Sequence, residues 1–335
     1  MNNKENKMGT APIGQLMIKM AIPVIISMVL QACYNIVDSI FVSHMPDSGG
    51  ISGLGEYGVN ALTLAFPLQM LIGAFGVGTG VGVNALLSRK LGEKDFERVG
   101  LASGNGTFLG LLIYAGFIVF GIFGIDPYTF SQTNDPVSIE MCSAYLRINI
   151  FAGFGLIFFG IHEKLLQATG KTIYSTIAQI TGAAVNLILD PIMIFGFLGM
   201  PALGIAGAAW ATVIGQIASM VVAVALHYTK NKEVPKGLRY FRPEGRTIKD
   251  ILSVGVPAII MQGLLSVMSY GINIIFGNVS PAAVTAYGVF FKMQQFLLYA
   301  IFGFRDVITP IISYNYGMKD RQRVMQGIRY GTLYI

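Results

Sequence analysis

The sequence carries little charge for its length. Asp, Glu, Lys and Arg make up 12% of the 335 residues, against roughly 25% in soluble domains. Hydrophobic residues make up 53%, and the mean hydropathy is +0.62. This composition cannot cover a water-facing surface, so it excludes an ordinary soluble protein. We predict an all-α polytopic membrane protein whose apolar segments cross the bilayer as helices.

Cysteine and histidine are also scarce, with two and three residues. Cys33 and Cys142 fall inside apolar stretches and form no CxxC pair, which argues against a disulfide framework or a metal site. His44 lies in a predicted loop, and His162 and His227 lie near helix ends. No nucleophile, base and metal constellation is apparent, so we expect neither an enzyme nor an organic cofactor.

Lys and Arg are missing from every second predicted loop. Twenty of the 23 basic residues lie in segments 4–19, 89–98, 164–171, 230–249 and 319–329, and the gaps around Asp47, Asp126, Asp135, Gly199 and Asn278 contain none. Cytoplasmic loops retain Lys and Arg. We therefore predict a multi-pass protein of the plasma membrane with a cytoplasmic N-terminus and cytoplasmic basic segments, the one around Lys164 included. Topology and anionic lipid explain the net charge of +6, so we expect no nucleic-acid partner.

Apolar stretches long enough for a hydrocarbon core of about 30 Å predict eight complete helices. They cover residues 14–43, 57–87, 99–124, 138–163, 172–197, 204–228, 248–277 and 282–314. A ninth begins near Val324 and is incomplete at Ile335, so we expect a fragment of a longer protein. The predicted domains are a six-helix lobe (1–229), a cytoplasmic linker (230–247) and a partial second lobe (248–335).

The sequence contains a repeat. A shift of 225 positions aligns the second predicted helix and its basic exit with the eighth without a gap, and LGEKDFERV at 91–99 then lies against YGMKDRQRV at 316–324. With one inserted residue, Pro23 in the first helix matches Pro257 in the seventh. The period is six helices, which gives both lobes the same orientation in the membrane. Alternating-access transporters are built in this way.

Two acids, Asp38 and Asp190, lie inside predicted helices of the first lobe. Each follows a basic residue by 19 positions, Lys19 and Lys171, so at about 1.5 Å per residue they share one depth. A carboxylate in a membrane helix indicates a functional site by default. The residues that we assign to one cation-coupling site are Gln31, Asn35, Asp38, Asn186, Asp190 and Thr212. The site would bind Na⁺ through oxygen or share a proton; alternatively, Asp38 caps its helix and Asp190 satisfies a break at Pro191.

The second lobe has different polar residues. Asp306 lies inside the eighth predicted helix, where we predict that it attracts a cationic substrate; alternatively, the neighbouring Arg305 neutralises it and its role is structural. The other residues that we assign to the substrate site are Gln69, Gln294, Phe66 and Tyr299, with the two repeat-related glutamines on opposite walls of one cleft. Pro23 and Pro257 are either hinges or static kinks.

At these residues the chain resembles the multidrug and toxic compound extrusion family, and within it the bacterial multidrug efflux branch. The motifs are YNIVDSIFVS (34–43), LLSRKLGEKD (86–95), LQATGKT (166–172), NLILDPIMIFGF (186–197) and LGIAGAAWATVIGQ (203–216). The resemblance implies two six-helix lobes, a cation-linked site at Asp38, Asn186 and Asp190, and substrate binding between the lobes. It also implies a bend at Pro23. The chain departs from the family in lacking most of the second lobe, and its seventh helix carries Asn273 in place of an acid.

We therefore expect a secondary active transporter, monomeric in the lipid bilayer, that exports cationic amphipathic drugs in exchange for H⁺ or Na⁺. The only metal ion expected is Na⁺ at Asp38 and Asp190. One alternative is a flippase of the same superfamily for lipid-linked or polysaccharide substrates, which would be expected to have a more basic cavity. The other is a non-transporting membrane scaffold.

Overall fold

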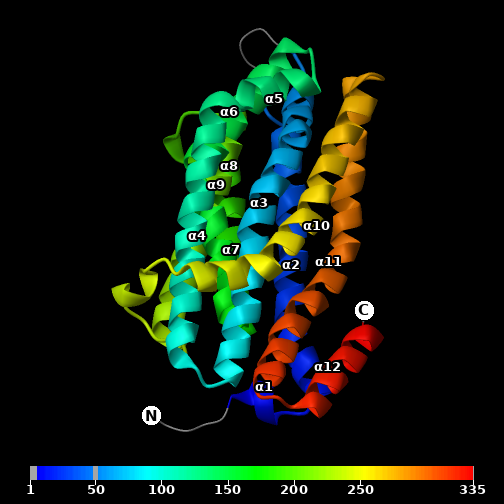
Figure 1. Cartoon of the computed structure of the whole chain (residues 1–335). Coiled ribbons are helices and arrows are strands. Elements are labelled where there is room, and N and C mark those ends of the chain that lie inside the picture. The colour runs from blue at the N-terminus through cyan, green and yellow to red at the C-terminus, as the bar shows by residue number, and fades with distance from the viewer. Residues whose placement is uncertain (1–5, 48–51, 335) are drawn as a thin grey trace.

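The structure, a computed structural model, describes residues 6–47 and 52–334, except the side chains of residues 295–297 and 300. Residues 1–5, which include Lys4 of the first basic segment, lie outside the described part. The regular elements of the described ranges are all helices, arranged as an elongated bundle (Figure 1). The predicted all-α architecture is confirmed. The helices are α1 (Lys7–Thr10), α2 (Ile13–Ser43), α3 (Leu54–Gly92), α4 (Phe96–Phe123), α5 (Ile125–Gln132), α6 (Pro136–Phe151), α7 (Phe154–Gln167), α8 (Thr172–Phe195), η1 (Phe197–Gly199), α9 (Ile205–Lys230), η2 (Leu238–Phe241), α10 (Gly245–Gly277), α11 (Pro281–Gly317) and α12 (Arg321–Tyr334).

Six of the described helices are long and apolar enough to cross a membrane, namely α2, α3, α4, α8, α9 and α10. Helices α6 and α7 pass the same test together, as a seventh span bent by 50°. Helix α11 has 37 residues, and at 1.5 Å per residue its length of about 55 Å also exceeds the hydrocarbon core.

The predicted single helix over 138–163 is wrong in one respect, because the chain breaks between α6 and α7. A Cβ on Gly153 would lie 1.8 Å from the Asn149 carbonyl oxygen, so only glycine fits this bend. The Tyr114 hydroxyl donates a 2.6 Å hydrogen bond to the Phe151 carbonyl freed by the break. Helix α7 then continues to Gln167, so Lys164, predicted in a cytoplasmic loop, lies inside a helix.

The connections α3–α4 and α11–α12 have the same conformation, which confirms the repeat over these residues. The aligned Lys94 and Lys319 both have left-handed backbones, with φ of 60° and 59°. The next residue caps the following helix in both cases: Asp95 accepts a hydrogen bond from the Arg98 N–H, and Asp320 accepts one from the Arg323 N–H. We call the end of the bundle that carries residues 93–95 and 318–320 the basic end.

At the basic end, α3 and α11 pack against each other symmetrically. A Cβ on Gly92 would lie 2.1 Å from the Tyr314 carbonyl oxygen, and a Cβ on Gly317 would lie 2.1 Å from the Arg89 carbonyl oxygen. The shift of 225 relates Gly92 to Gly317 and Arg89 to Tyr314. The two contacts are therefore copies of one contact around a pseudo-twofold axis.

The same symmetry joins the first lobe to α10 and α11. Gly78 of α3 lies against Ile259 of α10, and its repeat mate Gly303 of α11 lies against Ile25 of α2. The two inter-lobe helix pairs, α3 with α10 and α2 with α11, are thus equivalent. Small residues at these crossings let the backbones approach closely.

The N-terminal segment lies at the basic end, where it bridges the two lobes. Asn6 donates a 3.3 Å hydrogen bond to the Thr169 carbonyl in the first lobe. Asn315 and Arg323 of the second lobe donate to the Met8 carbonyl, both at 3.0 Å. Figure 1 shows α1 beside the α11–α12 connection.

Candidate functional site

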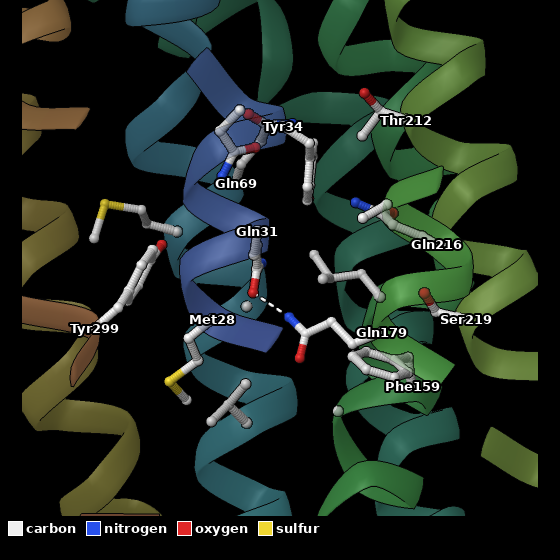
Figure 2. A pocket seen from close by; sticks show the side chains of 18 of the residues that line it. Met28, Gln31, Tyr34, Gln69, Phe159, Gln179, Thr212, Gln216, Ser219 and Tyr299 are labelled. Atoms are coloured by element: carbon white, nitrogen blue, oxygen red, sulfur yellow. Dashed lines mark hydrogen bonds between the residues drawn. The ribbon is translucent and has the colours of Figure 1, made fainter. Parts of the chain in front are cut away.

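A cavity of about 350 Å³ lies in the middle of the bundle. Its walls come from α2, α3 and α6 to α9 of the first lobe and from α10 and α11 of the second. Figure 2 shows Gln31 and Tyr34 of α2, Gln179 of α8 and Tyr299 of α11 around it. The inter-lobe position is the one expected of a substrate site in a transporter with repeated lobes.

Nine of the eleven predicted site residues line this cavity. They are Gln31, Asn35, Asp38, Phe66, Gln69, Asn186, Thr212, Tyr299 and Asp306. Asp190 lies behind the wall, fully buried. Gln294 is exposed and is not among the lining residues, so the two repeat-related glutamines do not face each other across the cavity.

The different positions of Gln69 and Gln294 have a structural reason. Gln69 donates hydrogen bonds to the Tyr145 hydroxyl at 3.1 Å and to Asn149 Oδ1 at 3.3 Å, both on α6. Gln294, the repeat mate of Gln69, lies on an exposed face of α11. Repeat alignment placed the two residues at one depth but did not fix which way each side chain faces.

Asp38 and Asp190 lie together, with Asn186 joining the second acid to the cavity wall. Asn186 Nδ2 donates a 3.2 Å hydrogen bond to Asp190 Oδ1 and a 3.5 Å hydrogen bond to Thr212 Oγ1. The carboxylates of Asp38 and Asp190 are near enough to repel each other. Asp38 is 7% exposed and Asp190 0% exposed.

Three oxygens of this cluster are buried without a hydrogen-bond partner within the described residues: Asp38 Oδ1, Asp190 Oδ2 and Asn186 Oδ1. An unpaired buried carboxylate oxygen is costly. A proton can relieve this cost, and so can a hard cation, which prefers oxygen ligands. The donor set therefore fits H⁺ or Na⁺, whereas residues 6–47 and 52–334 contain no group of three or more His, Cys, Asp or Glu for a transition metal.

Lys292 of α11 faces the same cluster from the second lobe. Its ammonium group donates a hydrogen bond to the Ser39 hydroxyl, next to Asp38 on α2, and its charge acts on Asp38. Lys292 therefore links the charge state of Asp38 to α11.

A second charged cluster lies in the cavity wall near the basic end and joins the lobes. Lys164 of α7 is 1% exposed, and its ammonium group lies 2.5 Å from Asp306 Oδ2 on α11. Lys164 also donates to Gln167 at 3.0 Å and lies 3.9 Å from Glu163 Oε2. Arg305 donates to the other Asp306 oxygen at 3.3 Å. Both oxygens of Asp306 are thus paired with cations.

The sequence reasoning missed Glu163 and Lys164 as cavity residues because it ended the helix too early. The first glycine after residue 163 is Gly170, which has a positive φ of 77°. The predicted helix 138–163 already contained Glu163, and extending it to that glycine would have placed Lys164 inside it as well. Two oppositely charged side chains in a membrane helix then call for partners on another helix.

Pro23 and Pro257 lie inside continuous helices, α2 and α10. Both helices continue past their proline without a break, so the choice between a hinge and a static kink stays a prediction.

A family model described as MatE matches residues 23–192 and 257–335. Relatives include the Multidrug export protein MepA of Staphylococcus saprophyticus, 28% identical over 313 residues that cover 93% of this chain and 66% of the relative. The MepA of Staphylococcus aureus strain MRSA252 is 26% identical, covering 95% of this chain and 68% of the relative. The chain spans about two thirds of the length of these relatives.

Solved structures show the same fold. A MATE crystal structure in complex with MaL6 matches 98% of this chain and 70% of its own chain, at 24% identity and a TM-score of 0.84. A structure of the MATE multidrug transporter DinF-BH matches 97% of this chain and 72% of its own, at 26% identity and a TM-score of 0.85. The family model covers most of the chain, and the lobe repeat and inter-lobe cavity agree with it: the chain belongs to the MatE family, the multidrug and toxic compound extrusion proteins.

Proposed function

We propose that the protein containing this chain is a secondary active transporter that exports cationic amphipathic drugs in exchange for H⁺ or Na⁺. The observation that carries this proposal is the pair of buried acids, Asp38 and Asp190, with unpaired oxygens beside an inter-lobe cavity. We further propose that it is monomeric, that it resides in the plasma membrane and that its basic end faces the cytoplasm.

The coupling follows from electrostatics. Without a bound ion, Asp38 and Asp190 repel each other, and uptake of H⁺ or Na⁺ removes that repulsion. Helix α2, which carries Asp38, packs against both α8 and α11. A shift of α2 on ion uptake therefore reaches the second lobe, and Lys292 adds a direct electrostatic connection.

The cavity wall suits amphipathic substrates. Aromatic and methionine side chains such as Phe66, Phe159, Tyr299 and Met28 offer adaptable apolar contact. A cation over an aromatic face gains about 0.5–2 kcal/mol. Asp306 remains a proposed substrate contact, but Lys164 and Arg305 share its charge, so we assign the main attraction for a cation to Asp38.

The test is transport by the intact protein reconstituted in liposomes. A cationic fluorescent dye is loaded, and either a pH jump or a Na⁺ jump is imposed. We expect one of the two gradients to drive dye movement, and collapse of that gradient by an ionophore to stop it. A Glu56→Gln control, which removes an exposed acid at the start of α3, should transport normally. A rate of dye movement that depends on neither the pH gradient nor the Na⁺ gradient would contradict the coupling.

The flippase alternative keeps one observation in its favour. Lys164, Lys292 and Arg305 all line the cavity, so it offers three cations beside the carboxylates of Asp38, Glu163 and Asp306. The same liposomes containing a fluorescent anionic lipid distinguish the two functions. Translocation of the lipid without dye movement would favour the flippase.

A further inference from the structure

The segment between α9 and α10, residues 231–244, is fixed to the outside of α4. Figure 1 shows it lying beside α4, away from the centre of the bundle. Tyr240 of η2 is buried there: a Cβ on Gly100 would lie 2.6 Å from its ring, and a Cβ on Gly104 would lie 1.9 Å from its carbonyl oxygen. Two glycines of α4 thus form the groove that holds the segment.

Asn105 of α4 closes this attachment. Its Nδ2 donates a 3.2 Å hydrogen bond to the Arg242 carbonyl, and its Oδ1 accepts a 2.8 Å hydrogen bond from the Glu244 N–H. The Phe241 ring packs edge-on against Phe108, with centroids 6.2 Å apart. These contacts fix the position of residues 240–244 along α4.

That position is the edge of the hydrocarbon core. Exposed apolar side chains on α4 continue to Phe123, and Asp126 follows. Gly104 lies 19 residues before Phe123, or about 28 Å at 1.5 Å per residue, which nearly equals the core thickness of about 30 Å. The segment docked at Gly100–Asn105 therefore lies where acyl chains meet head groups.

The outward face of the segment combines apolar and basic side chains. Leu238 is 93% exposed and Phe241 40% exposed. Seven Lys and Arg residues but only two Glu residues lie between positions 230 and 249. Lys232 and Arg242 are exposed, and neither forms an ion pair within the described part of the chain. Water is a poor environment for Leu238, whereas an anionic leaflet suits both kinds of side chain.

We propose that this segment is an anionic-lipid anchor, with Leu238 and Phe241 inserted at the acyl boundary and Lys232 and Arg242 bound to anionic head groups. It joins the two lobes. Lipid binding would thus hold the connection between them at one membrane depth.

The test measures tryptophan fluorescence, and this chain contains one tryptophan, Trp210, that has to be replaced. In the intact protein, Leu238→Trp is combined with Trp210→Phe and with Phe at every tryptophan outside this chain, which leaves one tryptophan at the predicted insertion point. Leu238 makes little contact with the protein, so the change should not disturb folding. Nanodiscs of phosphatidylglycerol or phosphatidylcholine, each brominated near the glycerol, then report contact by fluorescence quenching.

We expect blue-shifted emission, and at least about twofold stronger quenching in the anionic lipid, because basic residues near the surface are attracted to anionic head groups. Adding Lys232→Gln and Arg242→Gln should remove this preference. The matched control, Lys319→Gln with Arg321→Gln, removes two exposed charges from the α11–α12 connection and should retain it. Water-like emission without quenching, or equal quenching by both lipids, would overturn the proposal.

Discussion

Two clusters of buried carboxylates lie at different ends of the cavity. At the end away from the basic end, Asp38 and Asp190 each have one buried oxygen without a partner among the described residues. Near the basic end, by contrast, Asp306 pairs with Lys164 through one oxygen and with Arg305 through the other. Both clusters line one cavity or its wall, and both are built of membrane-buried carboxylates. The difference lies in what each can still bind. An unpaired carboxylate can take up an ion, while a paired one holds two helices together.

The two clusters also differ in how they connect the lobes. Asp38, Asn186 and Asp190 all belong to the first lobe. Asn273, the repeat counterpart of Asp38 on α10, uses its amide group to donate a 3.1 Å hydrogen bond to the Thr63 carbonyl. Lys164 and Asp306 belong to different lobes. We therefore propose that ion exchange takes place in the first lobe and that the Lys164–Asp306 contact connects the two lobes.

The largest expected effect is loss of coupling at the unpaired acids. Asp38→Asn and Asp190→Asn, each in the intact protein, should abolish gradient-driven dye transport because an amide cannot exchange a proton and binds Na⁺ weakly. Two acids that act as one unit are non-additive, so under the proposed shared site the double variant should be little worse than either single one. Transport assays in liposomes measure this, and wild-type rates in either single variant would contradict the shared site.

The next effect concerns stability at the paired cluster. Lys164→Met leaves Asp306 and Glu163 buried beside fewer cations, and breaking a buried pair costs about 3–5 kcal/mol. Arg147→Met removes an exposed pair with Asp126 and should cost less than about 1 kcal/mol. Thermal unfolding can be followed by thiol labelling of the buried Cys142 in a Cys33→Ala background.

A rescue variant makes the stability comparison sharper. Combining Lys164→Met with Asp306→Leu replaces the pair by apolar groups and should recover part of the lost stability. If the double variant is less stable than Lys164→Met alone, Lys164 and Asp306 do not act as a pair.

A smaller effect is expected at the two matched corners of the basic end. Arg323 donates to the Met8 and Ala11 carbonyls at 3.0 and 2.7 Å, whereas its repeat mate Arg98 lies 3.7 Å from Asp95 at the surface. Arg323→Gln should weaken the attachment of residues 7–11 by about 1.5–3 kcal/mol, the value of hydrogen bonds from charged donors. Amide hydrogen exchange in that segment measures the loss. Arg98→Gln is the matched control, and equal exchange in both variants would show that the corners are equivalent.

The smallest effect should follow Asp306→Asn. Lys164 and Arg305 already neutralise this carboxylate, so affinity for a cationic dye should fall by less than about fivefold, or 1 kcal/mol. Binding to the purified intact protein, measured by dye fluorescence, should show a much larger loss for Asp38→Asn. The reverse order would make Asp306 the principal substrate contact.

Much of this protein follows from local sequence. The apolar lengths predict the helices, and the matched segments 91–99 and 316–324 predict the repeat that Lys94 and Lys319 display in their backbones. Equal spacing from Lys19 and Lys171 brings Asp38 and Asp190 to one depth. These features depend on distances along one helix, which follow from the rise of 1.5 Å per residue.

Only the tertiary structure decided which groups meet across helices. Hydropathy placed Lys164 in a loop, yet it lies in α7 against Asp306, which is 142 residues away along the chain. Gln69 and Gln294 share a repeat position, but α6 supplies partners only to Gln69. The direction in which a side chain faces depends on how its helix is rotated and on which helix packs against it, and both depend on all neighbouring side chains at once. Local sequence therefore set the depth of each polar residue, and tertiary packing set its partner.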